Sequence, residues 1–218
     1  LLDGPTINIA LEHGGSGLQY HHQMSSAKGM IIEDRLRQMQ EQTDSKHMPF
    51  VVQFPMRALL AAAPHLSETL NAYTGSETIY CNFGNLLPVF AFEVLDWYVK
   101  ALTTKDWLMF QPVQETVEKH DRWYYFYIYV AMKKLGMDSL AGQVGCLVEI
   151  FINRYGLAGD YGCFVQLLKH LSADDPLLPL LAKRYVEMSL GGAMSMLAEL
   201  FKHLDKDFPH FGVVVREV

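Results

Sequence analysis

The sequence predicts an α+β fold in which a small three-stranded sheet is covered by helices and followed by a helical extension. Three early segments alternate apolar and polar residues at period two, helical spacing of apolar residues dominates the rest, and half of the 218 residues are hydrophobic. Disordered chains combine few apolar residues with a high net charge. This chain has a formal net charge of −6 and 19% charged residues, so it has enough apolar side chains to bury a core.

The three period-two segments are expected to form the strands, because a strand buried on one face alternates in this way. Their apolar residues are Ile7, Ile9 and Leu11, then Phe50, Val52 and Phe54, then Ile79, Cys81 and Phe83. Residues 14–47, which begin with a Gly-Gly-Ser-Gly run, are interpreted as an insertion between the first two strands. Within it, residues 31–42 fit either a loosely held helix or a loop.

Helical spacing begins at Arg57, and Pro64 interrupts it. An interior proline removes a hydrogen bond and clashes with the preceding turn, so two short helices meeting near Ala63 are expected. A helix after the third strand has an apolar face at steps of three and four residues, made of Leu87, Phe90, Val94, Trp97 and Ala101.

The second half is expected to be almost wholly helical. An aromatic-rich helix over residues 122–134 ends at Gly136, and N-caps are expected at Asp138, at Asp160 and at Asp174 or Asp175. The apolar faces of these helices are Leu140, Val144, Leu147 and Phe151; Tyr161, Val165 and Leu168; and Leu178, Leu181, Tyr185 and Met188. A last helix carries Met194, Leu197, Phe201 and Leu204 before Pro209 breaks the pattern.

Composition disfavours several classes of partner and location. The 18 basic residues form no run that would bind a phosphate backbone, so no nucleic acid is expected. The longest apolar stretch, Tyr124 to Met132, is about half the ~20 residues that a membrane-spanning helix needs. Three cysteines without a C-x-x-C pair indicate reduced thiols, and therefore an intracellular protein of the nucleus or cytoplasm.

No spacing typical of a catalytic, cofactor or metal site occurs in the sequence. The nine histidines and three cysteines lack a four-ligand zinc pattern, and His13, His21 and His22 are the nearest approach to one. Cys81, Cys146 and Cys163 lie in apolar stretches and are interpreted as core residues. Neither a Gly-x-Ser-x-Gly elbow nor a glycine-rich phosphate loop is present, so we expect no enzyme, no cofactor and no metal.

The order of the motifs resembles that of BTB/POZ domains of fungal type. Residues 54–66, FPMRALLAAAPHL, match the family pattern F-x-V-H-K-x-x-L-A-x-x-S-P-Y-F at Phe54, Arg57, Leu60 and Pro64. Residues 79–83 resemble the third strand, and FEVLDWYVKAL resembles the helix F-x-x-x-L-x-W-x-Y-T-G. YFYIYVAMKKLGMDSLAGQVGCLV is similar to the next helix pair, and DPLLPLL is similar to the segment "SPLR-x-LL".

The chain departs from the family pattern inside the first of these motifs. Met56 stands at the histidine position, Ala63 at the serine position, and His65 and Leu66 replace the aromatic pair. The polar centre that many relatives build around this histidine therefore lacks one member.

The resemblance implies a BTB/POZ-like domain over residues 1–135 and a helical extension over residues 136–218. It implies a non-catalytic protein–protein interaction module, acting as an adaptor or in self-association, with another BTB chain or a cullin-type ubiquitin ligase scaffold as partner. The scaffold needs an exposed apolar residue with an acidic neighbour, such as Phe90 with Glu93 or Val94 with Asp96. The predicted contact residues are Phe90, Glu93, Trp107, Leu108, Met109 and Phe110.

One alternative function stays open, in which the protein is an enzyme or a small-ligand binder. Catalytic or ligand-binding groups that lie far apart in the sequence can meet only in the folded chain. A small-ligand binder or an enzyme of this kind has no signature in sequence spacing.

Overall fold

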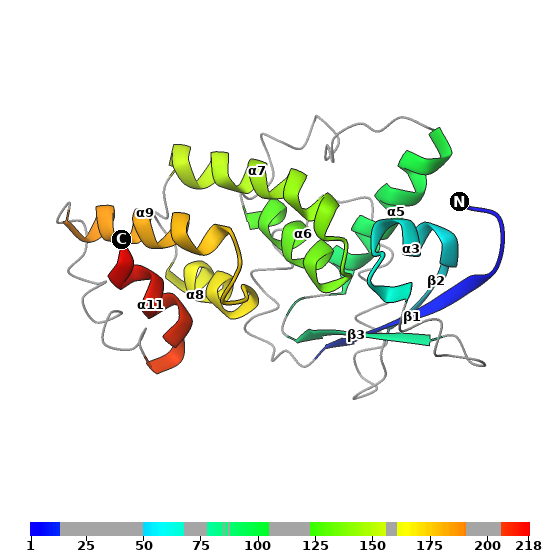
Figure 1. Ribbon diagram of the computed structural model, residues 1–218, viewed down its shortest axis with the longest axis horizontal. Coiled ribbons are helices and arrows are strands. Elements are labelled where there is room, and N and C mark those ends of the chain that lie inside the picture. Colours follow the sequence, from blue (N-terminus) through cyan, green and yellow to red (C-terminus); the bar gives the residue numbers. More distant parts are fainter. Residues whose placement is uncertain are drawn as a thin grey trace. The chain divides into compact units, whose positions relative to one another are not determined.

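The structure is a computed structural model that describes residues 1–13, 50–67, 78–84, 86, 88–104, 123–155, 161–190 and 206–218. These residues form a three-stranded mixed sheet and seven helices (Figure 1), so the predicted α+β class is confirmed. They divide into two compact units, Leu1–Val144 and Gly145–Val218. The division falls inside helix α7 (Asp138–Tyr155), whereas the sequence interpretation places it between residues 135 and 136.

Several sequence interpretations lie outside the described residues. They concern the insertion over residues 14–47, the N-cap at Asp160 and the helix from Met194 to Leu204.

The sheet of the first unit contains all three predicted strands, β1 (Thr6–His13), β2 (Phe50–Pro55) and β3 (Thr78–Gly84). Their order is β2-β1-β3, with β1 antiparallel to β2 and parallel to β3. Ile9 of β1 lies opposite both Val52 and Ile79, so the alternating residues of the three strands share one face.

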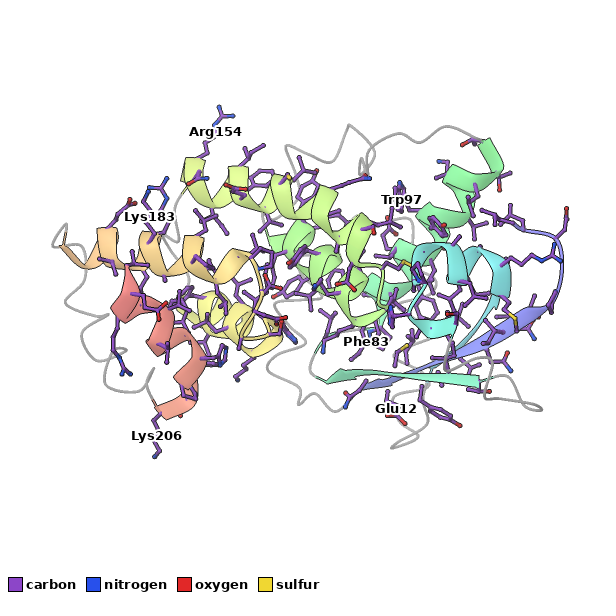
Figure 2. The ribbon with its side chains drawn as sticks, in the orientation of Figure 1. Glu12, Phe83, Trp97, Arg154, Lys183 and Lys206 are labelled. Atoms are coloured by element: carbon purple, nitrogen blue, oxygen red, sulfur yellow. The ribbon has the colours of Figure 1, made fainter. Side chains whose placement is uncertain are left out.

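The two faces of the sheet have different environments. The predicted core residues Ile7, Leu11 and Phe83 are buried, whereas Glu12 and Asn82 are exposed. Figure 2 shows Phe83 on the side of the sheet that faces the helices and Glu12 on the opposite side. Because successive side chains of a strand point to opposite faces, this alternation gives the sheet one buried face and one face with exposed side chains, where Ala10 of the central strand is nevertheless buried.

Helix α3 (Met56–Ala62) follows β2 directly and ends before Pro64, as predicted. The backbone N–H of Ala63 still donates to the carbonyl of Leu59, at 2.8 Å, but the proline has no N–H with which to continue the ladder. A new turn then begins, in which the N–H of Leu66 donates to the carbonyl of Ala63 at 3.1 Å.

Helices α5 (Val89–Thr104) and α6 (Trp123–Lys134) pack against each other in the first unit. Every side chain from Tyr124 to Met132 is buried, which confirms that the aromatic-rich helix lies in the core. Figure 1 shows α3, α5 and α6 on the same side of the sheet, and α6 contacts β3. The first unit is therefore a sheet with helices over one face.

Gly136 ends α6, as the sequence predicts. Its φ of +74° lies in the left-handed region, which glycine enters without the steric cost of a Cβ atom. The N–H of Gly136 donates to the carbonyl of Lys133 at 3.0 Å, and that of Met137 donates to Met132 at 2.9 Å. These two bonds satisfy carbonyl groups that the end of the helix would leave without partners.

The start and the buried face of α7 differ from the predictions. Asp138 is the first helical residue, not the residue before it, and its carboxylate forms an ion pair with Lys133 at 2.5 Å. Of the predicted face, Val144 is buried, whereas Leu140, Leu147 and Phe151 are half-buried. The buried face consists of Ala141, Val144, Val148 and Ile152.

The second unit contains α8 (Tyr161–His170), α9 (Leu177–Leu190) and α11 (Pro209–Glu217). Its core includes Phe164, Tyr185 and Phe211, one from each helix, with ring centroids 5.5–5.9 Å apart. Asp175 is 4% exposed and accepts a hydrogen bond from the N–H of Leu177 at 3.0 Å, so it is the residue that caps α9.

Pro209 does follow a break in the helical pattern, at Phe208, but the sequence interpretation did not include the helix that begins at Pro209. Pro209 stands in the first turn of α11, where its missing N–H costs no hydrogen bond and its fixed φ favours a helix. The helix buries Phe211 and Gly212.

Candidate functional site

The predicted contact residue Phe90 lies in the core of the first unit. Its side chain is 0% exposed, and its ring centroid lies 5.0 Å from that of Tyr127 and 6.3 Å from that of Tyr124. Val94 is buried to the same degree. A scaffold contact needs an exposed apolar residue on this helix, and neither Phe90 nor Val94 is one.

Glu93, the acidic residue of the predicted pair, is bonded inside the chain. The hydroxyl of Tyr124 in α6 donates to Oε1 of Glu93 in α5 at 3.2 Å. Burial of Tyr124, together with the neighbouring Glu93 carboxylate, raises the pKa of the phenol well above its usual value. Tyr124 therefore stays a neutral donor, and the bond links the two helices.

The remaining predicted contact residues, Trp107, Leu108, Met109 and Phe110, lie outside the described residues. Their role in binding a partner stays a prediction.

The cysteines occupy different environments. Cys81 in β3 is half-buried, and burial raises the pKa of its thiol from 9.0 to about 11, so it is a poor nucleophile at neutral pH. The expectation that Cys146 is a core residue is wrong, because it lies on the exposed side of α7. The side chain of Cys163 is outside the described part of the chain.

Lys134 is a half-buried cation at the end of α6. Burial lowers the pKa of its ammonium group. The group donates to the backbone carbonyl of Asn82 in β3, at a distance of 3.4 Å. This contact joins the helix to the sheet, so the lysine has a structural role here.

In the described ranges, no group of three or more His, Cys, Asp or Glu side chains is placed to hold a metal ion. None of the helices in these ranges has the length and apolar character needed to cross a membrane.

The open face of the sheet carries the exposed apolar side chains of the first unit's strands. Val51 of β2 is 57% exposed and Tyr80 of β3 is 63% exposed. Both lie opposite Ala10 of the central strand, so the three residues form one row across the sheet, in which Ala10 itself is 0% exposed between the two exposed side chains. At the usual strand spacing, Val51 and Tyr80 are about 10 Å apart.

Polar residues border this row on both sides. We call the whole surface the outer sheet face; it consists of Asn8, Ala10, Glu12, Val51, Gln53, Thr78, Tyr80 and Asn82. Glu12 is its only charged residue. An apolar centre with a polar, weakly charged border is the composition that protein–protein interfaces favour, and tyrosine is enriched in them.

The two edge strands of the described sheet, β2 and β3, also carry little charge. Each of β2 and β3 pairs with one neighbour, β1, within the described sheet. Neither Phe50–Pro55 nor Thr78–Gly84 contains a charged residue, although charged side chains commonly prevent edge strands from pairing with other chains. This surface is therefore chemically suited to contact with another protein chain.

The sequence interpretation missed Val51 and Tyr80 as candidate site residues. The signal was present in the strand pattern, because both are apolar residues at positions that alternation assigns to the outward face. The inward-facing residues, such as Val52 and Ile79, are enough to predict the strands, but they do not reveal the row of Val51 and Tyr80 on the outward face.

Comparison with known proteins found no relative of this chain. The chain matches no protein-family model, and searches of curated proteins and of solved structures found no similar protein.

Proposed function

We propose that the chain is a non-catalytic protein–protein interaction module of BTB/POZ-like type, and that its contact surface is centred on the outer sheet face. The observation that carries the proposal is the exposed row of Val51 and Tyr80, in register across Ala10. Apolar side chains held on a regular sheet are already ordered, so a partner that covers them does not have to fix their backbone.

Two side chains are too small to form a whole interface, so Val51 and Tyr80 can only be part of one. A stable protein–protein contact buries about 800 Å² on each partner, more than two side chains supply. We therefore assign Val51 and Tyr80 to the centre of the contact. The polar neighbours Gln53, Thr78 and Asn82 form its rim, where hydrogen bonds and ordered water are common.

The BTB/POZ-like assignment is supported by the order of elements. The motifs that carry the resemblance fall on β2, α3, β3, α5, α6, α7 and α9, and those up to α6 belong to a sheet with helices over one face, as the resemblance implies. Of the two partners that it implies, another BTB chain is the better candidate. Binding to a cullin-type scaffold through α5 would require Phe90 or Val94 to leave the core. The proposal places this adaptor or self-associating module inside the cell.

The test compares proteins captured by tagged variants in extracts of the source organism. The variant Val51→Glu with Tyr80→Glu places two charges at the centre of the outer sheet face, where a buried and unpaired charge opposes binding. The matched control is Ile150→Glu, because Ile150 is 57% exposed and belongs to helix α7 rather than to a strand. Both variants are first checked for wild-type thermal stability.

The proposal expects proteins that are captured by the wild-type chain and by the control but lost with the double variant. A capture profile that is the same for all three chains would contradict it. The enzyme or small-ligand alternative is tested by thermal shift with a panel of cofactors, and a saturable rise of several degrees would overturn the non-catalytic assignment.

A further inference from the structure

We draw no further inference here: the strongest candidate, the exposed row of Val51 and Tyr80 on the outer sheet face, belongs to the surface already described, and nothing in the structure shows which chain covers it.

Discussion

At the scale of single residues, Gly136 has two independent reasons to be glycine. Its φ of +74° is a conformation that other residues rarely adopt, and a Cβ atom added there would overlap the imidazole of His65. The contact brings the turn after α3 against the turn after α6. A side chain at this position would require the exposed imidazole of His65 to move.

We expect Gly136→Ala to lower the free energy of unfolding by about 1–2 kcal/mol, the cost of a left-handed conformation for a residue with a Cβ atom. Urea denaturation measures the change. Combining it with His65→Ala removes the overlap but not the backbone cost, so the loss of about 1–2 kcal/mol should persist in the double variant.

Gly142 provides the control for this substitution. It lies in α7 with no atom within 4 Å of an added methyl group. Gly142→Ala should therefore raise stability by about 0.5–1 kcal/mol, because alanine favours a helix more than glycine does. A Gly136→Ala variant at least as stable as the wild type would contradict the explanation given for Gly136.

The two described cysteines should differ in reactivity. A thiol pKa of about 11 in place of 9.0 reduces the thiolate fraction of Cys81 about 100-fold at neutral pH, and the thiolate is the reactive form. Cys146 is exposed, so iodoacetamide should alkylate it first in the native protein. The rate at Cys81 should rise about tenfold per pH unit until the pH approaches 11.

Peptide mass spectrometry at a series of reaction times separates the two sites. After denaturation in urea, the difference in rate should disappear, because both thiols are then in water. Native Cys81 that reacted as fast as Cys146 at neutral pH would contradict the burial of the β3 side chain.

At the scale of elements, one hydrogen bond links α5 to α6. We expect Tyr124→Phe to cost about 1–2 kcal/mol of unfolding free energy, because it removes a donor to a carboxylate while preserving the buried ring. Glu93→Gln keeps an oxygen that can accept the same bond and should cost less. Urea denaturation of both single variants and the double variant gives their coupling, and additive effects would show that the link contributes nothing.

The helices also show where sequence patterns are sufficient and where they are not. The aromatic-rich stretch of α6 is apolar on all sides, and its burial follows from composition alone. In α7, apolar residues extend beyond one stripe, so periodicity allows two neighbouring faces and only packing selects the one with Ala141 and Val148. The helix α11 was missed because three consecutive valines disfavour a helix locally, whereas burial of Phe211 stabilises it.

At the scale of the whole molecule, the strands were the most predictable feature. Alternation in each segment defines which residues face the helices, and a slip of one residue would expose them, so the pattern also limits the register. The pairing order β2-β1-β3 and the parallel pairing of β1 with β3 depend on contacts between distant segments. Periodicity within one segment contains no information on them.

The candidate surface was less predictable than the strands for a related reason. Val51 and Tyr80 lie 29 positions apart in the numbering and on strands that do not touch each other. They become one row only because β1 pairs with both strands and places Ala10 between them. Until the pairing is known, each is a single exposed apolar residue, which is common on protein surfaces.

The most direct measurement of the central claim is photo-crosslinking in cells of the source organism. The photoreactive residue p-benzoylphenylalanine replaces Tyr80 in one variant and Ile150 in the other, two residues with similar exposure. If the outer sheet face binds a protein, the variant at position 80 should give a discrete crosslinked protein, of twice the chain's mass if the partner is a second copy, and the variant at position 150 should not give it. Crosslinks that are the same at both positions, or none at position 80, would contradict the claim.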